Sequence, residues 1–205
     1  MSYIIWLLGG YLLGSIPVAW LLTKWATGRD LRQLGSGNVG VMNTALSAAR
    51  WVGALVFLCE IGKGVLAVFI PRSVGEAEII TGLLVIAVVV GTRWPVWLGF
   101  KGGRGNTAGM AALLLISWQA LASVLGIWVL TRLLLSSSFK ATRIALAMLP
   151  IITWAITRSG WYTLMGLGLA LIYLSAQQPE TDDHQLIKER WPSFWAFLTG
   201  PRRSK

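Results

Sequence analysis

Long apolar runs alternate with short polar connections along most of the chain. The runs cover residues 3–22, 51–71, 77–91, 107–131, 144–157 and 160–176. A helix needs about 20 apolar residues to cross the hydrocarbon core of a bilayer, where its backbone groups must pair within the segment. The pattern therefore predicts an all-α fold, a polytopic bundle of membrane helices.

Composition supports this prediction and excludes an ordinary soluble globule. Of the 205 residues, 55% are apolar or aromatic and 13% are charged, against about 25% charged in soluble domains. The first run lacks a preceding basic segment, so we expect a retained span and not a cleavable signal peptide. We expect a single domain over residues 1–205.

The charge balance is strongly basic, with 18 Lys and Arg residues against 8 Asp and Glu and a net charge of +10. In a membrane protein such an excess reports topology and attraction to anionic headgroups. We therefore expect membrane lipid and no nucleic acid as a partner.

The basic residues gather between the apolar runs. Four clusters are Lys24, Arg29, Arg32 and Arg50; Arg93, Lys101 and Arg104; Arg132, Lys140 and Arg143; and Lys188, Arg190, Arg202, Arg203 and Lys205. If all face the cytoplasm, the run 107–131 must be two short helices meeting near Ile116, Ser117 and Trp118. This topology has about seven transmembrane helices, an outside N-terminus and a cytoplasmic C-terminus. A single span over 107–131 is the alternative, and it places residues 132–143 outside.

Aromatic residues and the one cysteine refine this picture. Many of the 12 Trp residues lie near predicted helix ends, where they favour the membrane interface. The tail, residues 177–205, is expected to lie along the cytoplasmic interface. The single cysteine, Cys59, excludes an intramolecular disulfide framework, and its apolar neighbours favour a packed thiol.

The first polar connection contains a glycine-rich segment. It reads Gly35, Ser36, Gly37, Asn38, Val39 and Gly40, followed by Asn43. The spacing matches G-x-G-x-x-G, but a dinucleotide site needs a preceding strand, and membrane helices flank this segment. Glycines still let backbone N–H groups approach an anion. The segment predicts a phosphate cradle, with a flexible turn as the alternative.

A second glycine-rich segment leads directly into an apolar run. It comprises Lys101, Gly102, Gly103, Arg104, Gly105, Asn106 and Thr107. Two cations beside a helix N-terminus are suited to binding phosphate. A positive-inside loop is the alternative for this segment alone, but two such loops on one predicted face favour a phosphate site.

Three further ionisable residues are candidates. Glu60 and Lys63 lie one turn apart within an apolar run, where charges are costly and mark functional sites by default. The alternative is an internal ion pair. His184 is the only histidine, so the sequence holds no multi-histidine metal site. Its spacing to Glu189 is that of a His-x4-acid dyad, an isolated match in the tail.

Several ordered motifs resemble those of one family. They are Gly14-Ser15-Ile16-Pro17, Asp30-Leu31-Arg32, Gly35-Ser36-Gly37-Asn38-Val39-Gly40 with Asn43, Gly62-Lys63-Gly64, Trp94-Pro95-Val96 and Lys101-Gly102-Gly103-Arg104-Gly105. In this order they resemble the bacterial acyl-phosphate:glycerol-3-phosphate acyltransferases, the PlsY family. The resemblance extends from residue 9 to about residue 110.

The resemblance implies a seven-helix enzyme of the bacterial plasma membrane. Such an enzyme moves a fatty acyl group from acyl phosphate to position 1 of glycerol 3-phosphate, giving lysophosphatidic acid and phosphate, with its active site on the cytoplasmic side. It implies catalytic roles for Ser36, Asn38, Lys101 and Arg104. Substrate-binding roles follow for Gly35, Gly37, Gly40, Asn43, Lys63, Gly102, Gly103, Gly105 and His184. We expect no cofactor and no metal.

The sequence also departs from the family pattern. Val41 and Met42 stand where Ala-Thr is usual, Leu46 replaces an arginine, Glu60 an aspartate, Thr92 a histidine, and Ile187 an asparagine. Losing charge-assisted bonds of about 1.5–3 kcal/mol each is enough to change the substrate. The alternatives are therefore a divergent member with another acceptor or no turnover, or a transporter. Against transport, the polar residues gather at one face, and the halves show no inverted repeat.

Overall fold

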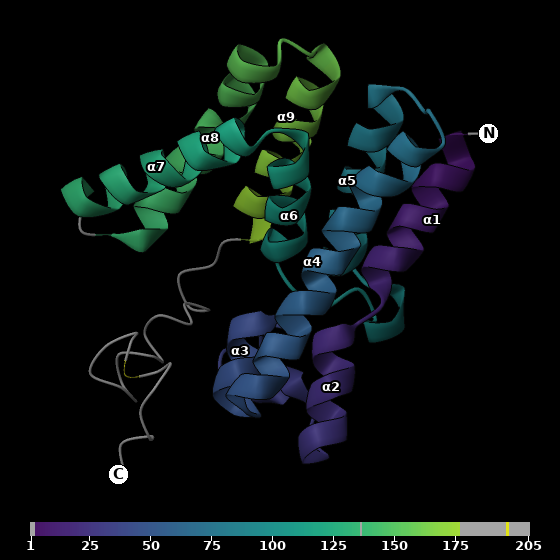
Figure 1. Cartoon of the computed structure of the whole chain (residues 1–205). Helices are drawn as coiled ribbons and strands as arrows, with labels where there is room; N and C mark the ends of the chain where they lie inside the picture. The colour runs from purple at the N-terminus through teal and green to yellow at the C-terminus, as the bar shows by residue number, and fades with distance from the viewer. Residues whose placement is uncertain (1–2, 136, 177–195, 197–205) are drawn as a thin grey trace. The chain divides into compact units, whose positions relative to one another are not determined.

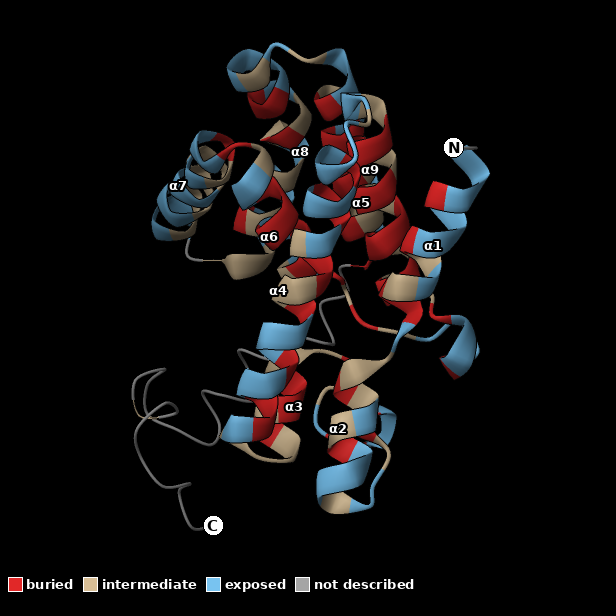
Figure 2. Ribbon diagram, turned by 45° about the vertical axis from the view of Figure 1, so that its right-hand side comes forward, coloured by how far each residue is buried: buried red, intermediate tan, exposed pale blue. Residues whose placement is uncertain are grey.

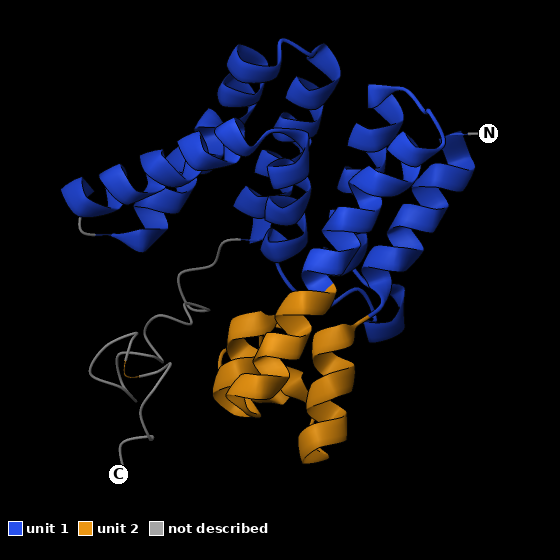
Figure 3. Ribbon diagram, viewed as in Figure 1, with its two compact units in different colours: residues 1–16, 60–177 blue, residues 17–59, 178–205 orange. Residues whose placement is uncertain are grey.

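The computed structural model describes residues 3–135, 137–176 and 196, and every regular element among them is helical. The predicted interfacial tail and His184 lie outside the described residues, apart from Ala196. The chain divides into two compact units, one of residues 1–16 and 60–177 and one of residues 17–59 and 178–205 (Figure 3). The prediction of one domain stays a prediction, because this division into compact units does not test it.

The first unit holds most of the helices seen in Figure 1. They are α1 (Tyr3–Ser15), the later part of α4 (Arg50–Ser73), α5 (Glu78–Arg93), the short 3-10 helix η2 (Val96–Leu98), α6 (Asn106–Ile116), α7 (Trp118–Leu135), α8 (Ser138–Thr157) and α9 (Gly160–Ala176). The second unit holds α2 (Val18–Thr27), the 3-10 helix η1 (Leu31–Gln33), α3 (Val41–Ser47) and the first part of α4.

Five helical stretches are long and apolar enough to cross a membrane. They are Tyr3–Thr27, Arg50–Ser73, Glu78–Leu98, Trp118–Leu135 and Ser138–Thr157, and two shorter apolar helices are Asn106–Ile116 and Gly160–Ala176. The helical bundle is thus as predicted, whereas the number of crossings and the sides of the termini stay predictions.

The pattern predicts one span over the first apolar run, residues 3–22. In the structure this run is divided between two helices. Helix α1 ends at Ser15, and α2 begins at Val18. Pro17 lacks an N–H group to continue the hydrogen-bond ladder and disfavours helical geometry at Ile16. Helix α2 then ends at Thr27, and its C-cap Gly28, left-handed with φ 68°, donates its N–H to the Lys24 carbonyl at 2.8 Å.

The predicted break in the run 107–131 is confirmed. Helix α6 ends at Ile116, and Ser117 is extended, with φ −158° and ψ 104°. The Ser117 hydroxyl accepts the N–H of Ala120 at 3.2 Å, so the serine caps α7 in the manner preferred at helix N-termini. Two helices therefore replace one long helix at this point.

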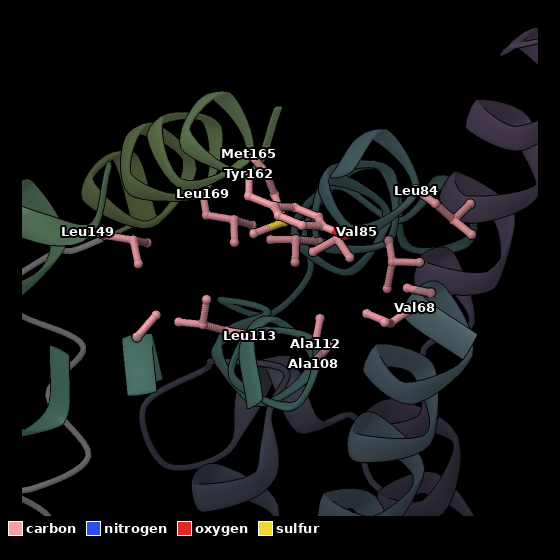
Figure 4. Packing of buried hydrophobic residues seen from close by; sticks show 14 of the residues in the cluster. Val68, Leu84, Val85, Ala108, Ala112, Leu113, Leu149, Tyr162, Met165 and Leu169 are labelled. Atoms are coloured by element: carbon pink, nitrogen blue, oxygen red, sulfur yellow. The ribbon is translucent and has the colours of Figure 1, made fainter. Parts of the chain in front are cut away.

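The core of the first unit forms where α5 packs against α1, α6 and α9. Buried side chains from these helices meet in Figure 4, among them Val85 of α5, Ala112 of α6, and Met165 and Leu169 of α9. Large apolar residues of α1, α6 and α9 outside this cluster are exposed, as expected where lipid and not water surrounds a bundle. Figure 2 marks exposed positions in pale blue.

Glycines bring α1 and α5 into backbone contact. A Cβ atom at Gly14 would lie 2.0 Å from the Val88 carbonyl oxygen, and one at Gly91 would lie 2.2 Å from the Tyr11 carbonyl oxygen. Small residues permit such close crossings in membrane helices. The crossing places the end of α1 beside the last turn of α5.

Cys59 corrects one expectation, because its side chain is exposed and not packed. Its neighbours Phe57 and Leu58 are exposed as well. In a helix of a membrane bundle, apolar neighbours indicate contact with lipid as readily as burial in protein.

Candidate functional site

The first glycine-rich loop begins with a capped 3-10 turn. The Asp30 carboxylate accepts the backbone N–H of Arg32 at 2.9 Å and pairs with its guanidinium, with Nη2 to Oδ2 at 2.6 Å. These hydrogen bonds from Arg32 hold the pKa of Asp30 well below its usual range. The pair fixes the entry of the chain into the loop.

The Asn43 side chain is the centre of this loop, and it is fully buried. Its Nδ2 donates to the carbonyl oxygens of Leu34 and Asn38, both at 2.9 Å. Its Oδ1 accepts the Ser36 backbone N–H and the Ser47 hydroxyl, both at 3.1 Å. Both ends of the amide are thus used within the loop, which gives Asn43 a positioning role.

Gly35 makes room for this amide. Its φ is +55°, and a Cβ there would lie 2.1 Å from Oδ1 of Asn43 and 2.7 Å from the Ser47 hydroxyl. Gly37 also has a positive φ, 72°, and Gly40 precedes α3 in an extended conformation. Gly35 and Gly37, which were predicted to approach substrate, are therefore also required by the loop's own geometry, whereas the backbone of Gly40 is open to other residues.

Asn38 differs from Asn43 in its surroundings. Its side chain is half-buried, and within the described part of the chain its amide makes no hydrogen bond. Ser36 is half-buried as well, and its backbone N–H is held by Asn43. Of the asparagines predicted for this loop, Asn38 is the one with an amide still able to bind a ligand.

The departures in α3 have a packing explanation. Leu46 is fully buried and contacts Met42 and Ala45. An arginine at position 46 in these surroundings would bury a charge, which is costly without a partner. The apolar residue fits the local core, and no cation is supplied at this position. Val41 is half-buried at the start of α3.

The second loop is held by the last turn of α5. The Gly103 N–H donates to the Thr92 carbonyl at 3.0 Å, and the Gly102 N–H donates to the Arg93 carbonyl at 3.1 Å. A Cβ at Gly102 would lie 2.3 Å from the Thr92 carbonyl oxygen, so only glycine permits this approach. Between Arg93 and Gly102 the chain passes through Pro95 and η2.

Gly105 ends this loop and caps α6. Its φ is +74°, and it offers no side chain to the amides of the first turn. Those N–H groups lie at the positive end of the helix dipole. Arg104, directly before the cap, is half-buried, and Lys101 is exposed. Cations and helix amides therefore occur together in one short loop.

The Glu60–Lys63 pair is internal. The Lys63 ammonium, 5% exposed, donates to Glu60 Oε1 at 2.7 Å, to the Ile16 carbonyl at 2.7 Å and to the Gly14 carbonyl at 3.2 Å. All three of its N–H donors thus have acceptors in the protein, and none is left for phosphate. Because Pro17 ends α1, the carbonyls at that end need such donors. The geometry supports the internal-pair alternative and gives Lys63 a structural role.

Thr92, which stands where the family has histidine, is buried. Its hydroxyl lies 3.0 Å from the Val88 carbonyl oxygen and 3.3 Å from the Gly14 carbonyl oxygen. The same Gly14 oxygen accepts Lys63. The last turn of α5 is therefore tied both to α1 and to the second loop.

The predicted site residues fall into two sets. Around Asn43, the second unit brings together Gly35, Ser36, Gly37, Asn38 and Gly40, and the first unit contains Lys63, Lys101, Gly102, Gly103, Arg104 and Gly105. Among residues 3–135, 137–176 and 196, no group of three or more His, Cys, Asp or Glu side chains could hold a metal ion.

Sequence reasoning missed one residue at the second loop. Tyr173 of α9 donates its hydroxyl to the Gly105 carbonyl at 3.2 Å. A tyrosine within an apolar run reads as ordinary core, and only the packing of α9 on this unit places it at the loop.

Comparisons with known proteins agree with the resemblance. The family model described as "Glycerol-3-phosphate acyltransferase" matches residues 4–181. A glycerol-3-phosphate acyltransferase of Synechococcus sp. (strain CC9902) is 34% identical over 174 residues, covering 85% of this chain and 87% of that protein. Glycerol-3-phosphate acyltransferase 1 of Dehalococcoides mccartyi is 39% identical over 175 residues, covering 81% and 83%.

Two crystal structures share the fold. Both are of PlsY (YgiH), an integral membrane glycerol 3-phosphate acyltransferase. Its glycerol 3-phosphate form matches with a TM-score of 0.73 and 24% identity over 100% of this chain and 96% of that chain. Its lysophosphatidic acid form matches with a TM-score of 0.73 and 22% identity, covering 92% and 93%. From the family model and the relatives, this chain belongs to the glycerol-3-phosphate acyltransferase family.

Proposed function

We propose that this protein transfers a fatty acyl group from acyl phosphate to the 1-hydroxyl of glycerol 3-phosphate. The products are lysophosphatidic acid and inorganic phosphate. Relatives named glycerol-3-phosphate acyltransferase support the acceptor and the reaction. The PlsY crystal structures, described as glycerol 3-phosphate and lysophosphatidic acid forms, support the same substrate and product.

The observation that carries the proposal is the second loop. Lys101 and Arg104 flank two glycines, and the left-handed Gly105 leads into α6 without a side-chain cap. Backbone N–H groups at a helix N-terminus and nearby cations are complementary to a phosphate group. We assign this loop to the binding of substrate phosphate.

The chemistry requires little beyond binding and charge neutralisation. The acceptor hydroxyl oxygen bonds to the acyl carbonyl carbon, and the bond from that carbon to the phosphate oxygen breaks. Phosphate departs, and the hydroxyl proton passes on balance to the phosphate product. Acyl phosphate is a mixed anhydride, so holding the two substrates together and stabilising the developing negative charge account for much of the acceleration.

The remaining assignments follow the same proposal. Lys101 and Arg104 neutralise phosphate, and Ser36 and Asn38 position polar groups of the substrates. Asn43 acts indirectly, since its amide holds the first loop. His184 of the tail is assigned to substrate binding by resemblance alone.

Localisation is part of the proposal. The apolar helices and family membership place the protein in a membrane, and the basic connections favour an active site on the cytoplasmic side of a bacterial plasma membrane. Membrane lipid then surrounds the bundle and supplies a path for the acyl chain.

The test is phosphate release from palmitoyl phosphate by purified protein in detergent, with and without glycerol 3-phosphate. We expect release that depends on the acceptor and disappears in Arg104→Ala. Formation of lysophosphatidic acid, followed by mass spectrometry, identifies the product. Release without acylation of glycerol 3-phosphate would overturn the proposed acceptor and favour a divergent member with another one, and no release above Arg104→Ala would favour a member without turnover.

A further inference from the structure

Tyr173 reaches the second loop from the far end of the sequence. It lies on α9, its side chain is 7% exposed, and its hydroxyl donates to the Gly105 carbonyl at 3.2 Å. Its ring belongs to the buried apolar cluster that also contains Ala108 and Leu169. The hydroxyl is thus a polar group in apolar surroundings, directed at one backbone oxygen of the loop.

Gly105 is the point at which that loop turns into α6. Its carbonyl also accepts the Gly109 N–H at 3.1 Å, the first bond of the helix. Its φ of +74° is left-handed, and a Cβ there would lie 3.1 Å from Val89 Cγ1. The orientation of this one residue sets the direction of the amides that follow and of Arg104 that precedes.

Gly109 is shaped to receive the phenol. A Cβ at this position would lie 1.7 Å from the Tyr173 hydroxyl oxygen and 3.0 Å from its Cζ. No other residue type fits beside the hydroxyl without displacing it. The N-cap of α6 therefore supplies the acceptor of the hydrogen bond, and Gly109 within the helix supplies the space that the donor requires.

We propose that Tyr173 is a positioning residue for the phosphate loop, because its hydroxyl holds the Gly105 carbonyl and so orients Arg104 and the first amides of α6. The inference rests on the proposed function for its substrate, glycerol 3-phosphate. Tyr173 is not assigned any contact with substrate.

The test compares Tyr173→Phe with wild type in steady-state acylation of glycerol 3-phosphate. The bound group in this inference is the phosphate of glycerol 3-phosphate, which takes no part in the bond changes. Because such a group is bound alike in the ground state and the transition state, the loss should appear in KM and not in kcat. A lost hydrogen bond of ordinary strength corresponds to about a threefold to tenfold rise in the KM for glycerol 3-phosphate. We expect kcat to change by less than about twofold.

Tyr162→Phe is the matched control. Tyr162 lies on the same helix about three turns away, is 6% exposed, and its hydroxyl accepts Arg72 Nη2 at 3.2 Å. Both substitutions remove a phenol oxygen from a similarly buried side chain, but Tyr162 lies away from the second loop. We expect its KM to match that of wild type. An equal rise in KM in both variants would show general loosening of α9 and overturn the inference, as would an unchanged KM in Tyr173→Phe.

A second measurement separates this inference from the proposed function. Calorimetric titration with glycerol 3-phosphate, without any acyl donor, reports binding whether or not the protein turns over. If wild type binds but does not acylate, the proposed function fails, and weaker binding in Tyr173→Phe alone still supports the inference. If wild type binds no glycerol 3-phosphate, the inference is overturned as well.

Discussion

Replacing Asn43 by alanine removes the hydrogen-bonded centre of the first loop. The amide makes two bonds of 2.9 Å as donor and two of 3.1 Å as acceptor, all from a fully buried side chain. At about 1 kcal/mol net for each bond, the sum is roughly 4 kcal/mol. The carbonyls of Leu34 and Asn38 keep backbone donors in Gly37 and Gly40, which lowers the expected cost to roughly 3 kcal/mol.

Hydrogen exchange measures this cost locally. The Ser36 N–H bonds to the Asn43 side chain, so its protection depends directly on the amide. A loss of roughly 3 kcal/mol in the free energy of loop opening corresponds to exchange on the order of a hundredfold faster. We expect this acceleration in peptides covering residues 31–42, measured by mass spectrometry on the protein in detergent.

Asn38→Ala is the control for exchange. Its half-buried amide makes no hydrogen bond within the described part of the chain, so exchange in the same peptides should stay within about twofold of wild type. Activity should fall in both variants, through loop order in one and through substrate contact in the other. Unchanged exchange in Asn43→Ala would refute the positioning role of this amide.

Three further predictions concern local conformation and charge. Gly35→Ala places a Cβ 2.1 Å from the buried Oδ1 of Asn43, whereas Gly28 has a similar positive φ but open space around it. The thermal unfolding midpoint should therefore fall further in Gly35→Ala than in Gly28→Ala, and equal shifts would contradict the steric argument. Lys63→Met leaves Glu60 buried without its partner and should cost about 3–5 kcal/mol of stability, measured by denaturant unfolding; Lys63→Met with Glu60→Leu should recover part of it, and no recovery would count against the pair. Because the pKa of Asp30 is lowered on folding, its contribution to the stability of the folded state is complete above about pH 4 and is lost as the pH falls further. The thermal unfolding midpoint of Asp30→Asn should lack this pH dependence, and matching pH profiles of the two proteins would contradict the prediction.

The glycine-rich loops show what a residue pattern can predict and what it cannot. The sequence predicts that they bind an anion, because glycine, short polar side chains and cations at such spacing suit anions. The sequence does not predict that Asn38 and Asn43 have different roles. Both are asparagines of one loop, and only the folded backbone determines that one amide is used internally while the other is left for a ligand.

The ion pair in α4 is a second case in which the sequence left alternatives that only the structure separates. Two charges in an apolar run indicate either function or internal pairing, and no local pattern separates these alternatives. The distances from Lys63 to the Gly14 and Ile16 carbonyls decide it. Those acceptors exist because Pro17, far from Lys63 in the sequence, ends α1.

Hydrophobic periodicity, basic clusters and ordered motifs by themselves determined that this chain is a helical membrane protein of the acyltransferase family. These properties depend on composition and on neighbours along the chain, and the positions of the basic clusters also predicted the break between α6 and α7. Tertiary structure alone decided which side chains hold the loops, as Tyr173 holds Gly105. Contacts between residues distant in sequence depend on how helices cross, and a single sequence does not encode those crossings in any local pattern.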